Sequence, residues 1–314
     1  MSAHDHRRDS HAHLPPQRKI VDLYTALEYE IFRVSGWSTE DWRRRMASRL
    51  LKRPLYRMAE VLAGLDDDIR RFGLRVGLTR FLGQFTCNIE WAAEQSIPQC
   101  GPLIVACNHP GTFDGFILAK LLQREDVKVI ARDMPLLRGL PHVSRHLIFS
   151  TRDTAQRVNV LREVIQHLKN GGVLLTFPRG TIEPDPATMR GAMREVRAWL
   201  PSLELWLRKV PETRLVIGII SQVTSPLALR MGRLFFRQQW NAQVAAEIVQ
   251  VAFQALFPQR WKIQPRVTFS VPLSWNTLQN ESPGESRIFP MIQAHVLRSM
   301  SEHQRLFYGV ELPG

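Results

Sequence analysis

Residues 103–114 read LIVACNHPGTFD, and this stretch carries the strongest structural signal in the chain. The charge-free apolar run Leu103–Cys107 predicts a buried strand, and the polar turn after it leads into a helical pattern over Phe113–Gln123. A strand that passes through a short turn into a helix is typical of an α/β fold with a largely parallel sheet. Functional side chains in such folds stand at the carboxyl ends of strands, which is where His109 lies.

The same alternation continues along the chain. Further short apolar runs predict strands at Val127–Ala131, Leu147–Phe149, Val173–Phe177, Leu215–Ile220 and Arg266–Val271. Helical patterns cover Thr154–Asn170 and Trp240–Phe257, and the first of them is stopped by a Gly-Gly pair. We therefore expect an α/β domain over residues 95–275, with a largely parallel central sheet flanked by helices.

The rest of the chain divides into three further regions by composition. We expect a disordered polar tail over 1–19, a helical N-terminal extension over 20–94, and a loop with a closing helix over 276–314. The tail contains the possible metal ligands His4, Asp5, His6, His11 and His13. Its short, Pro-ended polar composition favours disorder over metal binding, which is the alternative.

His109 and Asp114 are the candidate catalytic pair. They lie five residues apart, with His109 in the turn and Asp114 in the first turn of the helix, where the helix dipole favours an ionised carboxylate. The carboxylate can then hold one imidazole nitrogen and leave the other as a general base. A histidine at this spacing is also a common incidental feature of loops, so the pair needs further support.

That support comes from two more turns that follow predicted strands. They read FSTRD at 149–153 and FPRGTIE at 177–183. Together with NHPGTFD at 108–114, they resemble the glycerolipid acyltransferase family of the PlsC-like, 1-acylglycerol-3-phosphate acyltransferase type. That family shows N-H-x4-D (the HX4D motif), F-x-x-R and F-P-E-G-T-R in this order. The resemblance covers residues 98–274 and the amphipathic helices before them.

The resemblance implies a function for several of these residues. His109, oriented by Asp114, would take the proton from an acceptor hydroxyl, which then attacks the thioester of acyl-CoA or acyl-carrier protein. Arg152 would bind the acceptor's phosphate, and Gly180 and Thr181 would border the acceptor. The default acceptor is lysophosphatidic acid or a related lysophospholipid. Neither a bound cofactor nor a metal is implied.

The third turn departs from the family pattern. Arg179 replaces the usual acid and Ile182 the usual arginine. Three readings stay open: Arg179 supplies the missing positive charge, Glu183 returns the carboxylate, or the acceptor is not a glycerol phosphate. Asn108 and Glu183 are auxiliary candidates. The family's later Pro-rich strand element is not matched, since residues 215–221 read LVIGIIS.

The charge balance points to an anionic partner. The 314 residues contain 42 Lys+Arg against 29 Asp+Glu, a net charge of +13. Three segments hold basic but no acidic residues: Trp42–Arg57, Ile69–Phe85 and Pro226–Trp240. We expect the first to be a helix that ends at Pro54 and lies on an anionic membrane, or else packs its apolar face on the core. The candidate membrane contacts are Trp42, Arg44, Arg45, Arg49, Arg233, Phe235 and Phe236.

Other protein classes fit less well. The chain lacks a signal peptide and an apolar run long enough to span a bilayer, so we expect a cytoplasmic, peripherally membrane-associated protein. The three cysteines are expected to be reduced thiols. A serine hydrolase would need a G-x-S-x-G elbow, a Cys107–His109 dyad has no orienting group, and no nucleic-acid module is recognised. A member of the same fold that has lost catalysis and binds lipid is the remaining alternative.

Overall fold

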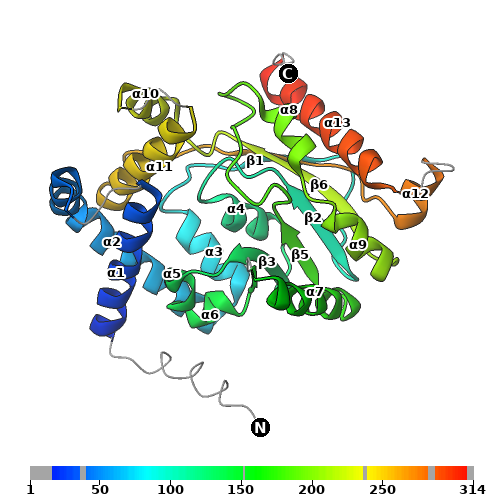
Figure 1. Ribbon diagram of the computed structural model, residues 1–314, viewed down its shortest axis with the longest axis horizontal. Coiled ribbons are helices and arrows are strands. Elements are labelled where there is room, and N and C mark those ends of the chain that lie inside the picture. The colour runs from blue at the N-terminus through cyan, green and yellow to red at the C-terminus, as the bar shows by residue number, and fades with distance from the viewer. Residues whose placement is uncertain (1–15, 36–39, 151–152, 236–238, 282–286, 310–314) are drawn as a thin grey trace, which may run out of the picture. The chain divides into compact units, whose positions relative to one another are not determined.

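The computed structural model describes residues 16–35, 40–150, 153–235, 239–281 and 287–309 (Figure 1). The chain forms two compact units. The α/β unit comprises Thr86–Arg132, His146–Glu247 and Ile263–Gly314, and the helical unit comprises Met1–Phe85, Asp133–Arg145 and Ile248–Lys262. The helical unit therefore takes in residues 133–145 and 248–262, which the expected boundaries assigned to the α/β domain.

A seven-stranded sheet forms the centre of the α/β unit. Its strands are β1 (Glu90–Ala93), β2 (Leu103–Cys107), β3 (Val127–Arg132), β4 (Leu147–Ser150), β5 (Val173–Thr176), β6 (Arg214–Ser221) and β7 (Arg266–Phe269). They stand in the order β1-β7-β6-β2-β5-β3-β4, and every pair is parallel except β6–β7. The expectation of a largely parallel sheet is confirmed. The carboxyl ends of β6, β2 and β5 consequently meet at one edge.

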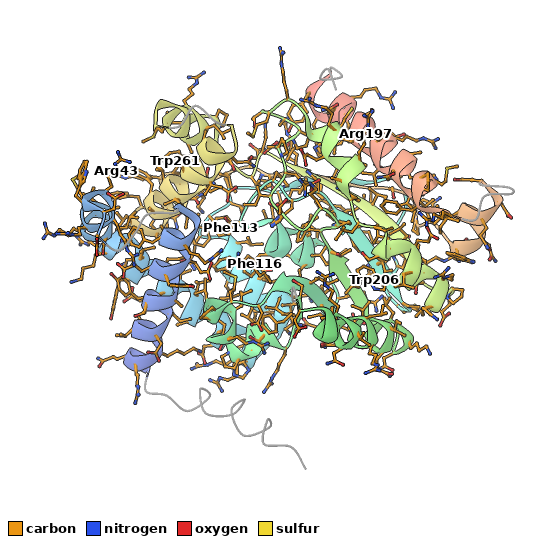
Figure 2. All side chains as sticks on the ribbon, in the orientation of Figure 1. Arg43, Phe113, Phe116, Arg197, Trp206 and Trp261 are labelled. Atoms are coloured by element: carbon orange, nitrogen blue, oxygen red, sulfur yellow. The ribbon has the colours of Figure 1, made fainter. Side chains whose placement is uncertain are left out.

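Apolar residues bury both faces of the sheet. All five residues of β2 are buried, and so are all four of β5. Ile104 and Ala106, which point to one face, pack in a core with residues of α7 (Thr154–Lys169), α9 (Ser202–Lys209) and α13 (Phe289–Tyr308). Trp206 of α9 belongs to this core (Figure 2). A strand buried on both sides reads as an unbroken apolar run, which is why β2 is evident in the sequence.

The other helices of this unit are α4 (Asp114–Leu121), α8 (Ala192–Glu195), the 3-10 turn Val196–Ala198, α10 (Pro226–Phe235) and α12 (Trp275–Asn280). Helix α11 (Gln239–Leu256) begins in the α/β unit, and its last residues belong to the helical unit. Most predicted elements agree with these bounds to within one or two residues. The predicted strand over 266–271 and the predicted helix over 113–123 are each shorter in the structure.

The helical unit is built from α1 (Pro16–Ser35), α2 (Trp42–Phe72), α3 (Leu74–Leu82), α5 (Pro135–Arg138) and α6 (Pro141–Ser144). The buried carboxylate of Asp66 in α2 connects three of them. It accepts hydrogen bonds from Lys19 Nζ of α1 (2.8 Å) and from the N–H groups of His142 (2.8 Å) and Val143 (2.9 Å) at the start of α6. These partners offset the cost of burying its charge.

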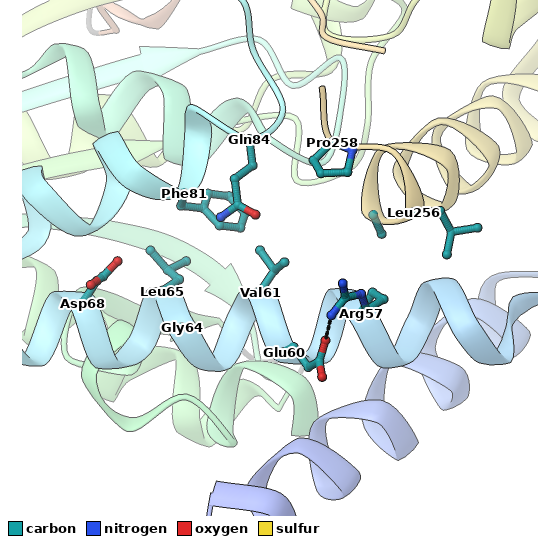
Figure 3. A pocket seen from close by; sticks show the side chains of 11 residues that line it. Arg57, Glu60, Val61, Gly64, Leu65, Asp68, Phe81, Gln84, Leu256 and Pro258 are labelled. Atoms are coloured by element: carbon teal, nitrogen blue, oxygen red, sulfur yellow. Dashed lines mark hydrogen bonds and ion pairs between the residues drawn. The ribbon is translucent and has the colours of Figure 1, made fainter. Parts of the chain in front are cut away.

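A groove of about 340 Å³ lies within this helical unit. Residues of α2, α3 and the end of α11 line it, and Arg57 forms an ion pair with Glu60 at 2.7 Å (Figure 3). None of the predicted site residues lines this groove. The geometry of the strand ends, rather than this cavity, therefore locates the candidate site.

Three predictions in the N-terminal region are wrong. The helix predicted to end at Pro54 continues to Phe72, because the buried apolar residues beyond Pro54 outweigh the roughly 3 kcal/mol that an interior proline costs. The region 20–94 is not wholly helical, since β1 pairs with β7. The expected tail is also shorter, because α1 begins at Pro16, and proline is favoured in the first helical turn. Residues 1–15, including the tail histidines, lie outside the described residues.

Candidate active site

The His109 turn, residues 108–113, connects β2 to α4 and brings the predicted pair together. Nδ1 of His109 lies 3.0 Å from Oδ2 of Asp114. The same carboxylate oxygen accepts a hydrogen bond from the N–H of Gly111 at 2.8 Å. The predicted hydrogen bond across the turn is therefore present, and it leaves Nε2 of His109 as the atom that can accept a proton.

Asp114 is completely buried, and His109 is partly open to solvent. Burial raises the pKa of Asp114, while the hydrogen bonds from His109 and Gly111 oppose that rise. Burial lowers the pKa of His109, but the hydrogen bond and charge of Asp114, together with the charges of Glu247 and Glu183, outweigh it, so the pKa of His109 is raised overall. The side chain of His109 is 27% exposed, which leaves the ring accessible to a reactant.

Aromatic packing fixes the plane of the imidazole. The ring of His109 stacks on Phe177, the first residue after β5, with centroids 4.3 Å apart and planes at 23°. The buried Phe113 precedes α4, which carries Phe116 in its first turn (Figure 2). An imidazole held between a carboxylate and an aromatic ring has little rotational freedom.

Glu183 holds the backbone of His109 rather than facing solvent. Its Oε2 accepts the N–H of His109 at 2.7 Å, its Oε1 accepts Nε1–H of Trp199 at 2.8 Å, and its own N–H donates to the carbonyl of His109 at 2.7 Å. Burial raises the pKa of Glu183 to about 7, against the lowering effect of these hydrogen bonds. Both carboxylate oxygens are engaged inside the protein. The suggestion that Glu183 returns the family's acceptor-facing carboxylate is therefore not supported.

Asn108 attaches the same turn to the strand on the other side of β2. Its Nδ2 donates to the carbonyl of Ile220 at 2.9 Å, and its Oδ1 accepts the N–H of Ile220 at 2.8 Å. The side chain thus pairs with β6 as a further strand residue would, and it is buried. Asn108 is a structural support of the turn.

Three residues that the sequence analysis missed also contact these turns. Trp199 reaches Glu183 as described, and Gln243 and Glu247 come from α11. Gln243 Nε2 donates to the carbonyl oxygens of Pro110 (2.7 Å) and Glu183 (3.0 Å). Nothing local in the sequence marks these residues, because they lie far along the chain from the turns that they bind.

The 177–183 turn presents its remaining predicted residues outward. Gly180 has φ +74°, a conformation that favours glycine, and a Cβ atom added there would have no neighbour within 4 Å. Thr181 is exposed. Arg179 is about one third exposed, and its Nε lies 2.7 Å from Oε2 of Glu195 in α8. The arginine that replaces the family's acid therefore already has a carboxylate partner.

Some predicted residues fall elsewhere. Arg152 and Phe236 lie outside the described residues, and Arg233 and Phe235 fall within α10. Strand β4, which precedes Arg152, stands at the edge of the sheet, separated from β2 by β3 and β5. The structure gives no further information on these four side chains.

The N-terminal half of α2 carries an exposed apolar stripe, Trp42, Met46 and Leu50, in which each residue follows the last by four. Arg45 and Arg49 are exposed beside it, as is Arg43 (Figure 2). Arg44 turns the other way, with its guanidinium 4.9 Å from the ring centroid of Phe32 in α1. The core-packing face of this helix is therefore the side of Arg44, and the Trp42 stripe faces outward.

The structure offers little support for a cysteine nucleophile, a metal site or a membrane-spanning helix. Cys107 is completely buried, and burial raises the pKa of its thiol well above the ordinary value, which disfavours a nucleophilic thiolate. Within the described residues, no set of three or more His, Cys, Asp or Glu side chains is arranged to hold a metal ion. In this part of the chain, no helix combines the length and the apolarity that crossing a bilayer requires.

Comparison with known proteins identifies the domain that contains this site. The family model described as Acyltransferase matches residues 88–199, which hold the His109 turn and the 177–183 turn. Residues 88–199 form an acyltransferase-family domain. The resemblance inferred from the three turns is thereby confirmed, and the family is one of enzymes that transfer acyl groups.

Two further searches complete the comparison. The chain is similar to the 1-acyl-sn-glycerophosphate (LPA) acyltransferase PlsC from Thermotoga maritima, at 17% sequence identity and a TM-score of 0.40, over 91% of this chain and 96% of that one. No curated protein matches the sequence significantly.

The buried carboxyl groups around the site predict a pH-dependent stability. Burial raises the pKa of Asp185 to about 7, so its contribution to the free energy of unfolding is full below its ordinary pKa of 3.8 and is lost as the pH rises through about 7. Asp185→Asn cannot ionise, so its melting temperature should fall less than that of the wild type between about pH 5 and about pH 9.

Asp67→Asn is the matched control for thermal unfolding by circular dichroism. The pKa of Asp67 is lowered by its hydrogen bond with Arg70, so its ionisation changes only at acidic pH. Its curve should parallel that of the wild type across this range. If the Asp185→Asn curve is also parallel to that of the wild type, the assigned ionisation is wrong.

Proposed function

We propose that this protein transfers a fatty acyl group from a thioester, acyl-CoA or acyl-carrier protein, to the hydroxyl of a lysophospholipid-like acceptor. His109 is the general base, and Asp114 orients it. The observation that carries this proposal is the 3.0 Å contact between His109 Nδ1 and the buried Asp114 carboxylate, at the end of β2, in a domain of the acyltransferase family. A partly exposed imidazole in this position has its second nitrogen available for proton transfer.

The reaction then follows from acid–base chemistry. Nε2 of His109 accepts the proton of the acceptor hydroxyl while that oxygen attacks the thioester carbonyl carbon. The C–S bond breaks as the ester C–O bond forms, and the imidazolium returns its proton to the departing sulfur. The products are the acylated acceptor and a free thiol, so neither a covalent enzyme intermediate nor a redox partner is needed.

Removing the imidazole of His109 tests the assigned base. His109→Ala should lower the rate of thiol release from a long-chain acyl-CoA, with mixed lysophospholipids as acceptors, by at least about a hundredfold. Wild type should yield an acylated product whose mass identifies the acceptor. Activity in His109→Ala within a few-fold of the wild type would refute the assigned base.

Asp114→Asn adds a test of the orienting carboxylate. Asp114 raises the pKa of His109, and the base acts in its neutral form. Removing the charge should therefore move the acidic limb of the rate–pH profile to lower pH while reducing the maximal rate. An unshifted limb would contradict the assigned coupling between Asp114 and His109.

The acceptor is proposed to lie against the 177–183 turn, where Gly180 and Thr181 are exposed beside Arg179. Arg152, by resemblance, is a second candidate phosphate ligand. The ion pair of Arg179 with Glu195 is the observation that favours the alternative acceptor without a glycerol phosphate, because this arginine is already neutralised. An acceptor with a phosphate and one without should therefore respond differently when Arg179 or Glu195 is replaced.

Kinetics with Arg179→Ala and Glu195→Ala distinguish them. If Arg179 binds the acceptor's phosphate, Arg179→Ala should raise the KM for lysophosphatidic acid severalfold, and Glu195→Ala, which releases the arginine, should lower it. Monoacylglycerol, which lacks the phosphate, is the control acceptor. Equal effects of both variants on the two acceptors would exclude phosphate recognition by Arg179.

We also propose that the Trp42 stripe of α2 contacts an anionic membrane surface. Three exposed apolar side chains between exposed arginines match an interfacial helix, which combines apolar burial with attraction to anionic lipid. This contact would bring the protein to the surface in which a lipid acceptor resides. The net charge of +13 supports an anionic partner.

Sedimentation with phosphatidylglycerol-containing vesicles tests the contact. The double substitution Trp42→Ala/Leu50→Ala should weaken binding by at least about tenfold, since it removes two apolar side chains from the interface. Leu306→Ala, at another exposed leucine, in α13, is the matched control and should bind as the wild type does. Unchanged binding by the double variant would leave the stripe without a membrane role.

A further inference from the structure

Helix α11 lies outside the segment that matches the acyltransferase family model, yet two of its residues bind the His109 turn. Gln243 and Glu247 are one helical turn apart and so share a face. Gln243 donates to the carbonyl of Pro110, and Glu247 Oε2 accepts a hydrogen bond from Thr112 Oγ1 at 2.7 Å. The turn between β2 and α4 is thus held from a distant part of the chain.

The burial of Glu247 destabilises the fold more than a purely structural contact requires. It is 6% exposed, and its other oxygen, Oε1, is buried without a hydrogen-bond partner among the described residues. A buried acceptor without a partner destabilises the folded state. A neutral side chain could accept the Thr112 hydrogen bond at lower cost, so the carboxyl group itself calls for an explanation.

The packing around Gly111 shows what Glu247 supports. A Cβ atom at Gly111 would lie 2.8 Å from Val223 Cγ2 and 3.4 Å from Glu247 Oε1, so a larger residue would force the side chain of Val223 to move. The N–H of Gly111 donates to the Asp114 oxygen that also contacts His109. Glu247 therefore adjoins the backbone group that fixes the orienting carboxylate.

We propose that Glu247, acting through Thr112, is a positioning residue that holds the His109 turn in the conformation in which Asp114 binds His109. This inference rests on the proposed function, in which His109 is the base. The carboxylate of Glu247 would also interact with the charges of Asp114 and His109. Its charge favours the protonated imidazole and opposes ionisation of a second carboxyl nearby.

The titration of these groups is coupled. Burial raises the pKa of Glu247 to about 8, the charge of Asp114 adds to that rise, and the hydrogen bond from Thr112 lowers it. Glu183 and Glu247 both raise the pKa of His109, in addition to Asp114. Ionisation of Glu247 favours the protonated form of His109. His109 therefore loses its proton over a wider pH range than it would beside Asp114 alone.

A double-mutant cycle on turnover tests the positioning role. Glu247→Ala and Thr112→Val should each lower kcat by about tenfold to a hundredfold, because a small misplacement of the base is costly. The double variant should lose little more than either single one, since both break the same contact. Thr112→Ser keeps the hydroxyl and should retain most activity, as should Glu247→Gln at its own optimum.

Val244→Ala is the matched control for packing. Val244 is half-buried on the same helix, and its replacement should leave kcat near the wild-type value. Equal losses in this control, or fully additive losses in the double variant, would overturn the positioning role. So would wild-type kcat in both Glu247→Ala and Thr112→Val while His109→Ala is inactive.

A titration of the His109 ring by NMR separates this inference from the proposed function, because it requires no turnover. Glu247→Gln should move the titration of His109 to lower pH, whereas Val244→Ala should leave it unchanged. An unmoved titration in Glu247→Gln would overturn the electrostatic part of the proposal. If wild type turns over no acceptor, the proposed function fails, and the titration still reports whether Glu247 acts on His109.

Discussion

The carboxylate of Asp114 is completely buried, and its hydrogen bonds determine how the rest of the site is arranged. A charge that is removed from water must be paired and hydrogen-bonded, or the group becomes neutral. Oδ2 of Asp114 meets this requirement with the imidazole of His109 and the N–H of Gly111, both within the turn that leads into its own helix, whereas Oδ1 is buried without a hydrogen-bond partner among the described residues. The conformation of the turn, the orientation of the ring and the ionisation of the pair therefore depend on one another. All three arise from contacts within the sequence NHPGTFD.

Contacts within the turn do not hold it alone, and residues from the rest of the sheet and from α11 supply further contacts. Because β2 stands between β6 and β5, its turn is held from both sides. Asn108 pairs with the backbone of β6, and Glu183, after β5, binds the backbone of His109. Gln243 of α11 joins the two turns by donating to Pro110 and to Glu183. A rigid scaffold of this kind preorganises a base without requiring the substrate to order it.

Residues whose roles depend on neighbours in sequence could be predicted, and those whose roles depend on long-range contacts could not. The strand at 103–107 and the His109–Asp114 pair follow from an apolar run and a short turn. Its charge makes Glu183 a candidate from the sequence, but its inward orientation depends on Trp199 and on the backbone of His109. Strand β1 is four residues long with little periodicity, and its pairing with β7 alone defines it.

The same distinction explains Pro54 and Glu247. Proline ends most helices, but here the buried face of α2 beyond it continues the helix to Phe72. A glutamate in an apolar helical pattern reads as an ordinary solvated charge, and only the tertiary fold brings it to Thr112. Conversely, Arg179 reads as a candidate ligand, and its pairing with Glu195 becomes apparent only in the structure.

The central claim is that Asp114 fixes the tautomer of His109 so that Nε2 is the basic atom. The most direct measurement is nitrogen NMR of the His109 ring in isotopically labelled protein, above the pH at which the ring loses its proton. The account predicts a proton on Nδ1, shared with Asp114, and a bare Nε2, with this preference lost in Asp114→Asn. A neutral ring that carries its proton on Nε2 in the wild type would contradict the account, because the atom assigned as the base would then be a donor.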